Sequence, residues 1–173
     1  MIEGLERVFT ARLRGDRPVA ADLDPWSAVF LADDFVGDHW PQDHRTPERA
    51  LAIHDADRAH WARFGFGPWS VRERETDRYV GRIGLTHTRE VGRPALEIGW
   101  LLAADARGNG YATEMGRETL RVAFDVLEAD RVVALITDDN LDSLAVAERL
   151  GFARTGEIEH AGVPHQVLEI ASE

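Results

Sequence analysis

The sequence predicts an α/β (α+β) fold in which a mixed, mostly antiparallel sheet of about seven strands is flanked by about four helices. Three observations support this prediction. Short runs with strand-like character recur along the chain, longer segments have the apolar spacing of helices, and turn residues separate them. With 173 residues, of which 44% are hydrophobic and 29% charged, the chain is expected to form one domain over residues 1–173.

The first half of the chain is expected to contain an opening strand, two helices and a meander. The stretch 5–14 has imperfect strand-like alternation, and apolar residues crowd a short helical segment within 18–35. A second helix starts at Thr46 as N-cap, with Pro47 in the first turn, and runs to about Phe64. Three antiparallel strands follow at 69–75, 79–90 and 95–103.

The last strand of this meander places a carboxylate in mid-strand. Alternate residues of a strand point to the same side. One face of the strand is apolar and carries Leu96, Ile98, Trp100 and Leu102. Glu97 and Gly99 fall on the opposite face, so the Glu97 side chain projects away from the apolar row.

The second half of the chain is expected to supply two helices and three strands. A long helix spans about 110–128, with apolar residues spaced to cover a sheet. RVVALIT, from Arg131, is a continuous apolar run typical of a central strand covered on both faces. A helix at 141–150 is expected to end at Gly151, which can adopt the left-handed conformation without a Cβ clash. The final strands are expected at 153–160 and 166–171, joined through AGVPH.

Composition excludes several classes of function. The 20 Lys and Arg against 31 Asp and Glu give a net charge of −11, which repels nucleic-acid backbones and would suit a cationic amine. No basic patch stands out along the sequence, so nucleic acid is not an expected partner. The absence of cysteine excludes disulfides, thiolate metal sites and thiol catalysis. Residues 1–17 lack the apolar stretch of a signal peptide and no run is long enough to cross a membrane, so we expect a cytoplasmic protein.

The spacing of the histidines along the chain does not indicate a metal site. His54 and His60 lie six residues apart in the second predicted helix, which places them on different faces. We therefore expect no bound metal.

A glycine-rich loop carries the strongest chemical signal. In ALEIGWLLAADARGNGYATEM a strand ends, and the loop leads directly into the long helix. Glycines let backbone N–H groups approach a ligand closely, and the helix start adds unpaired donors and the positive end of a dipole. Such a loop suits a diphosphate, although a plain turn would also fit the loop alone. Thr113 stands where a dinucleotide fingerprint needs its third glycine, and the Gly-Lys-Ser/Thr of a P-loop is absent.

Two ordered blocks of the sequence resemble the GNAT superfamily of acetyltransferases. RGNGYA matches the family's coenzyme A signature Arg/Gln-x-x-Gly-x-Gly/Ala, and EIGWLL lies upstream where the family has its fourth strand. TDDNLDSLAVAERLGF resembles the second block, with Asn140 and Ser143 before a helix that closes at Gly151. The resemblance covers most of the chain and implies a GNAT-type three-layer fold. With EIEHAGVPH, it is greatest to the branch that includes ribosomal-protein N-terminal acetyltransferases.

The resemblance implies transfer of an acetyl group from acetyl-coenzyme A to a primary amine by direct attack. Glu97 is then the expected base, acting directly or through water, whereas a solvent-facing strand carboxylate is its other interpretation. The amides near Leu101 and Leu102 would polarise the thioester carbonyl if the strand splays there. The expected coenzyme-binding residues are Leu101, Leu102, Arg107, Gly108, Asn109, Gly110, Tyr111, Ala112, Thr113, Asn140 and Ser143.

One expected catalytic group is missing. Ala147 stands seven residues beyond Asn140, where many family members carry a tyrosine acid, which leaves Ser143, a water or solvent to protonate the departing thiolate. Asn140 either binds the pantetheine arm or caps its helix. The resemblance places five residues at the acceptor entrance as a group, namely Trp40, His160, His39, His44 and His165.

Two functions from different classes stay open at this point. The first is catalysis on an amine, either a protein or peptide N-terminus or a small molecule, by a monomer or a homodimer. The second is a non-catalytic acyl-coenzyme A sensor or interaction module of the same fold, which the missing tyrosine favours. Thiol release from acetyl-coenzyme A across a panel of amines separates them.

Overall fold

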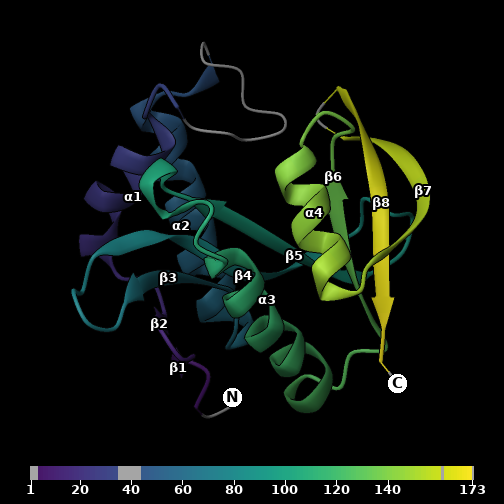
Figure 1. The fold of residues 1–173 in the computed structure, drawn as a ribbon, viewed down its shortest axis with the longest axis horizontal. Helices are drawn as coiled ribbons and strands as arrows, with labels where there is room; N and C mark the ends of the chain where they lie inside the picture. Colours follow the sequence, from purple (N-terminus) through teal and green to yellow (C-terminus); the bar gives the residue numbers. More distant parts are fainter. Residues whose placement is uncertain (1–3, 35–43, 161, 173) are drawn as a thin grey trace.

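The computed structural model describes residues 4–34, 44–160 and 162–172. Within these ranges the chain forms one eight-stranded sheet and four α-helices (Figure 1). The strands are β1 (Arg7–Phe9), β2 (Leu13–Asp16), β3 (Pro68–Glu73), β4 (Tyr79–Thr88), β5 (Ala95–Leu102), β6 (Arg131–Ile136), β7 (Ala153–His160) and β8 (Val163–Ala171). The α-helices are α1 (Leu23–Phe30), α2 (Pro47–Phe64), α3 (Tyr111–Arg121) and α4 (Leu141–Leu150). Short 3-10 turns lie at Ala20–Asp22 and Ala104–Ala106, and a π-helical turn, Val122–Val126, extends α3.

The strand order is β1-β2-β3-β4-β5-β6-β8-β7. Within this order, β5 and β6 are parallel, and each other neighbouring pair of described strands is antiparallel. The predicted meander is confirmed as β3-β4-β5. RVVALIT forms β6, which lies between β5 and β8, so the prediction that this apolar run is a central strand is also confirmed.

The predicted single strand at 5–14 is wrong, because this stretch folds as the β1–β2 hairpin. Residues 10–12 make the turn, and the backbone N–H of Thr10 donates to the carbonyl of Leu13 at 2.9 Å. Glu114 of α3 holds this turn by accepting from the Arg12 backbone N–H at 2.8 Å. This contact joins segments about a hundred residues apart, so alternation along the strand could not reveal it. The hairpin accounts for eight strands in place of the expected seven.

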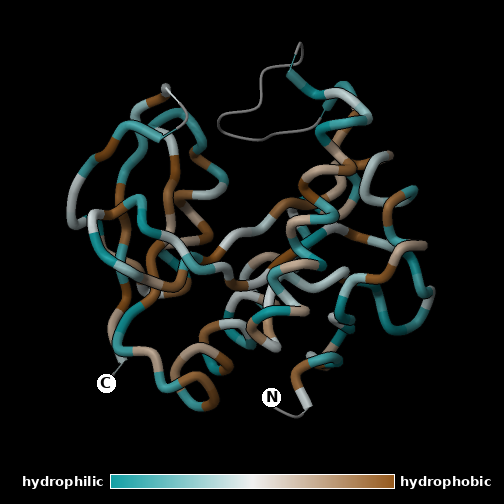
Figure 2. Tube along the Cα trace, turned by 180° about the vertical axis from the view of Figure 1, so that it is seen from behind, coloured by the Kyte–Doolittle hydropathy of each residue, from teal (hydrophilic) through white to brown (hydrophobic). Residues whose placement is uncertain are grey.

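Two layers of helices enclose the sheet, as the three-layer prediction requires. Helices α3 and α4 contact one another over one face, and α1 and α2 pack together over the other (Figure 1). Hydrophobic segments run along the central strands and the inward sides of the helices (Figure 2). Two arginines join the sheet to the layer formed by α1 and α2. Arg82 of β4 donates two hydrogen bonds to the carboxylate of Asp57 in α2, each 2.6 Å long. Arg72 of β3 donates one to Asp22, just before α1, at 2.6 Å.

The helix ends follow the predicted signals. The Thr46 hydroxyl accepts from the backbone N–H of Arg49 at 3.2 Å, and Pro47 occupies the first turn of α2. Gly151 ends α4 with φ of +90°, in the left-handed region that favours glycine. At the C-terminus, β8 begins at Val163 rather than at residue 166, so the last hairpin is longer and its loop shorter than expected.

Candidate functional site

The sheet opens between β5 and β6. These parallel strands pair only at Leu96 with Val132 and Glu97 with Val133. Beyond this point β5 continues to Leu102 along β4, while β6 continues along β8. A gap therefore forms in the middle of the sheet, and on this side part of the β5 backbone pairs with no other strand that the structure describes.

The alternation of β5 decides which amides face this gap. The backbone N–H of Ala103 donates to Val80 of β4 at 2.9 Å, and the carbonyl of Leu101 is directed at Gly81 of β4. Residues two apart in a strand share a direction. The amides of Trp100 and Leu102 therefore face the gap, whereas that of Leu101 faces β4.

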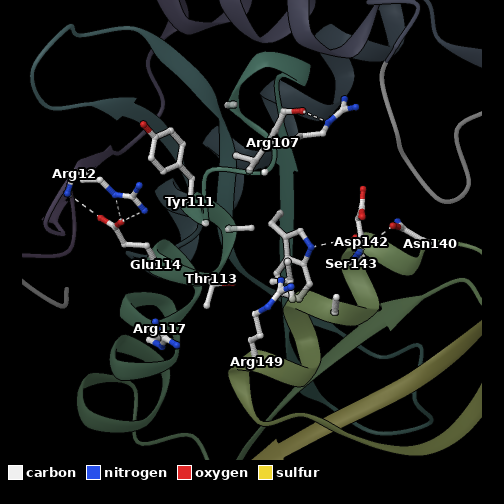
Figure 3. A pocket seen from close by; sticks show the side chains of 18 of the residues that line it. Arg12, Arg107, Tyr111, Thr113, Glu114, Arg117, Asn140, Asp142, Ser143 and Arg149 are labelled. Carbon is white, nitrogen blue, oxygen red and sulfur yellow. Dashed lines mark hydrogen bonds and ion pairs between the residues drawn. The ribbon is translucent and has the colours of Figure 1, made fainter.

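One cavity of about 710 Å³ lies between α3, α4 and the glycine-rich loop (Figure 3). We call it the α3–α4 cavity. The predicted coenzyme-binding residues that line it are Leu102, Arg107, Gly108, Gly110, Tyr111, Ala112, Thr113, Asn140 and Ser143. Leu101 does not line this cavity, and Asn109 contributes to it only through the shape of the loop. Residues from two distant sequence blocks are thus brought to one site.

The loop has the backbone conformation that an anion cradle needs. Gly108 and Gly110 have φ of +73° and +77°, in the left-handed region, and Gly110 is the N-cap of α3. The Asn109 side-chain amide donates to the carbonyls of Ala106 at 3.2 Å and Arg107 at 3.1 Å, so it closes the loop on itself. Backbone amides at the start of α3 remain available to an anion, together with the positive end of the helix dipole.

Four arginines surround the α3–α4 cavity, namely Arg12, Arg107, Arg117 and Arg149 (Figure 3). They come from the β1–β2 turn, the loop, α3 and α4, and among the described lining residues they outnumber the carboxylates, which are Glu114 and Asp142. This local positive charge in a chain of net charge −11 was not evident from the sequence, because no two of these arginines are close along the chain. Arg117 and Arg149 are exposed, and in the described part of the chain neither has an ion-pair partner. Their charge is therefore free to attract phosphate groups.

Tyr111 ties the loop to the rest of the molecule. Its hydroxyl donates to Glu73 Oε1 at 2.9 Å, and the Arg12 guanidinium lies 4.7 Å from the centre of its ring. Hydrogen bonds from Arg78, Thr76 and Tyr111 lower the pKa of Glu73 to about 2, so this carboxylate is ionised at neutral pH. Tyr111 thus fixes the position of the helix start.

A second cavity, of about 540 Å³, lies on the other face of the sheet beneath α2. We call it the α2 cavity. Glu97 lines it, together with His160, the Asp57–Arg82 pair and Gly99. A Cβ atom built on Gly99 would meet no atom within 4 Å, so this glycine leaves open space beside Glu97. The predicted opposite orientation of Glu97 and Trp100 thus directs Glu97 into a cavity rather than to bulk solvent.

Burial raises the pKa of the Glu97 carboxyl above its ordinary value, while a hydrogen bond from Thr88 opposes part of this rise. His160 also lowers the pKa of Glu97, and Glu90 raises it. His160 Nδ1 lies 3.4 Å from Glu90 Oε2. A carboxyl group with these surroundings has the character of a proton acceptor.

The two cavities meet at three of the described residues. Trp100, Asn140 and Ser143 line both of them. Asn140 is the N-cap of α4, and its Oδ1 accepts from the backbone N–H of Ser143 at 3.1 Å. Ala147, which lies one turn beyond Ser143 in α4, is fully buried. Ligands on opposite faces of the sheet could therefore come into contact beside Ser143.

The five residues expected at the acceptor entrance do not all gather there. His160 lines the α2 cavity. His165 is buried and packs against His160, with 5.3 Å between the centres of the two imidazole rings. His44 is exposed and lines neither cavity. Trp40 and His39 lie outside the described residues.

Over residues 4–34, 44–160 and 162–172, no three His, Cys, Asp or Glu side chains gather as metal ligands would. His54 is buried, whereas His60 contacts Phe66 and His87. Among the helices that the structure describes, none combines the length and the apolar character needed to span a membrane.

Comparisons with known proteins agree with this geometry. YkkB of Bacillus subtilis is 29% identical over 106 residues, which are 61% of this chain and 62% of YkkB. An acetyltransferase structure from Agrobacterium tumefaciens has a TM-score of 0.83 at 23% identity, covering 99% of this chain and 98% of that one. Mycobacterium smegmatis RimJ, solved in complex with CoA-disulfide, has a TM-score of 0.70 at 22% identity, covering 92% of this chain and 82% of that one.

Proteins named as ribosomal acetyltransferases are also among the similar proteins, in agreement with the branch that the sequence resembles. The sequence model described as "Acetyltransferase (GNAT) domain" matches residues 12–153, which include the loop, both cavities' shared residues and Glu97. The chain therefore belongs to the GNAT family of acetyltransferases.

Proposed function

We propose that this chain transfers an acetyl group from acetyl-coenzyme A to a primary amine, with the two reactants bound on opposite faces of the sheet. The observation that carries the proposal is the meeting of the α3–α4 cavity and the α2 cavity at the point where β5 and β6 diverge. Holding two reactants in contact is itself a large part of catalysis in a direct transfer.

The residues of the α3–α4 cavity fit acetyl-coenzyme A. Backbone amides from Gly108 to Thr113 would hold its diphosphate, and the surrounding arginines would add attraction to the phosphates. When bound, acetyl-coenzyme A would supply the acyl group as an activated thioester. The amides of Trp100 and Leu102 face the gap and would polarise the thioester carbonyl.

Glu97 would act as the base. An amine with a pKa near that of lysine, about 10.4, is mostly protonated at pH 7 and has to lose a proton to become a nucleophile. A carboxyl whose pKa is raised by burial holds that proton better than an ordinary glutamate. Glu97 would take it directly or through a water in the α2 cavity.

The acceptor would be a protein N-terminus or a small-molecule amine that fits the α2 cavity. The similar proteins named for ribosomal substrates favour a protein N-terminus. The Glu97 carboxyl in this cavity also suits a cationic amine before its deprotonation, since the Asp57 carboxylate there is already paired with Arg82.

The test is thiol release from acetyl-coenzyme A, measured across a panel of short peptides with free N-termini and small primary amines. Glu97→Gln should lower kcat on the best acceptor by about 100-fold or more, since general-base catalysis contributes about that much. Glu159→Gln, an exposed carboxylate on β7, is the matched control and should leave turnover unchanged. Tight coenzyme binding without turnover on any acceptor would contradict catalysis and favour the sensor.

A further inference from the structure

Trp100 and Ser143 meet where the α3–α4 cavity and the α2 cavity join. Trp100 belongs to the diverging part of β5, and Ser143 lies in the first turn of α4. The Trp100 indole Nε1 donates a hydrogen bond to Ser143 Oγ at 3.2 Å, drawn as a dashed line beside Ser143 in Figure 3. Both residues line both cavities, so this pair stands between the two proposed reactants.

The direction of this hydrogen bond determines where the serine proton can point. An indole N–H can only donate, whereas a hydroxyl has one proton and two acceptor lone pairs. Ser143 Oγ is therefore the acceptor, and its own proton points away from Trp100. Within the described part of the chain, no group accepts that proton. Ser143 lines both cavities, so their junction is within reach of this proton.

We propose that Trp100 is a positioning residue that turns the Ser143 hydroxyl toward the sulfur of the departing thiolate. This inference rests on the proposed function. The amine nitrogen bonds to the carbonyl carbon and the carbon–sulfur bond breaks, with its electron pair staying on sulfur. An ammonium group loses two protons on becoming an amide: Glu97 takes the first before attack and passes it to water, and it then takes the second. Ser143 donates a hydrogen bond to the sulfur and keeps its own proton, and the thiolate takes its proton afterwards from water. The positive end of the α4 dipole favours the same negative charge.

Ala147 explains why this chain needs such a pair. It lies four residues beyond Ser143, so both residues are on the same face of α4. Ala147 is fully buried and carries no donor, so it cannot assist the sulfur. Ser143, held by Trp100, is a donor at the junction that can take over this task.

The first test measures the pKa of the coenzyme A thiol when it is bound to the protein, from the ultraviolet absorbance of the thiolate against pH. A hydrogen bond to the charged form stabilises it, so the bound thiol should have a pKa about one unit below that of free coenzyme A. Ser143→Ala and Trp100→Phe should each return it most of the way to the free value. The double variant should add nothing to Ser143→Ala, because Trp100 acts through Ser143.

Trp26→Phe is the matched control. Its indole also donates to an oxygen, the carbonyl of Ala50 at 3.0 Å, but Trp26 lines neither cavity. This variant should leave the pKa of the bound thiol unchanged. Equal effects of Trp26→Phe and Trp100→Phe would mean that the change is a general loss of packing, and would overturn the inference.

A second readout needs no ligand. In a proton–nitrogen correlation spectrum, Ser143→Ala should move the indole N–H signal of Trp100, which the Trp100→Phe variant identifies by its disappearance, and leave that of Trp26 in place. An unmoved Trp100 signal would overturn the inference. Coenzyme A that binds with an ordinary thiol pKa would also overturn it while leaving the proposed function intact, whereas no binding at all would contradict both.

Discussion

Glu97 and Val133 are the last paired residues of β5 and β6, so the proposed base lies where the two strands begin to diverge. The carboxyl group gains access to a cavity there, but it is half-buried and so loses part of its contact with bulk water. The location that makes Glu97 suitable as a base therefore has an energetic cost.

This cost leads to the first prediction, which concerns stability. Because burial raises the pKa of Glu97 above its usual 4.5, the folded protein binds this proton more tightly than the unfolded chain. The stabilising contribution is fully present below the unfolded pKa and is lost as pH rises through the folded pKa. Glu97→Gln should thus increase the free energy of unfolding at pH 7.5 but not near pH 4. Urea denaturation at both pH values measures this, and an equal or lower stability of the variant at pH 7.5 would contradict it.

The second prediction concerns the glycine loop and separates charge from backbone strain. Gly110 has φ of +77°, which Asn and Asp tolerate better than other side chains. Gly110→Asn and Gly110→Asp have the same shape, but only Asp brings a negative charge to the proposed diphosphate site. If both variants are folded, calorimetry should show that Gly110→Asp binds coenzyme A at least about tenfold more weakly than Gly110→Asn. Equal affinities would place the phosphates elsewhere.

The third prediction concerns the arginines that the sequence did not reveal. Arg117→Gln and Arg149→Gln should each weaken coenzyme A binding by about two- to fivefold at low salt, which is typical of an exposed charge. The loss should shrink as salt concentration rises, because salt screens exposed charges. Arg154→Gln, on β7 and away from both cavities, is the control and should bind normally.

The fourth prediction uses the open space at Gly99. Since a Cβ there meets nothing within 4 Å, Gly99→Leu should fold normally and fill part of the α2 cavity. Turnover should then fall by roughly 100-fold through misplacement of the acceptor. Coenzyme A affinity should stay unchanged. Gly156→Leu makes the same change in the open space of another strand, β7, and should retain turnover, whereas loss of activity in both variants would refute the assignment of the α2 cavity.

Much of the fold could be predicted because its signals are local. The N-cap at Thr46, the helix stop at Gly151 and the apolar run of β6 each depend on a few neighbouring residues. The β1–β2 hairpin was missed because its turn is fixed by Glu114, far away in the chain. Local alternation contains no information about such a contact.

The candidate site shows the same division. The loop from Arg107 to Thr113 is a continuous motif, so sequence alone singled it out. The group of four arginines around the α3–α4 cavity and the Trp100–Ser143 hydrogen bond exist only after folding, because each brings together residues from separate elements. Which backbone amides of β5 face the gap depends on how β5 pairs with β4. The sequence therefore could not show that the amide of Leu102 faces the gap while that of Leu101 faces β4.

A crystal structure of the chain with bound coenzyme A would test the account most directly. We predict that the diphosphate contacts the backbone amides between Gly108 and Thr113, and that the sulfur lies in the gap beside Ser143 with Glu97 across it. A diphosphate bound away from this loop, or a sulfur bound outside the gap and away from Ser143, would contradict the central claim that the two cavities join donor and acceptor.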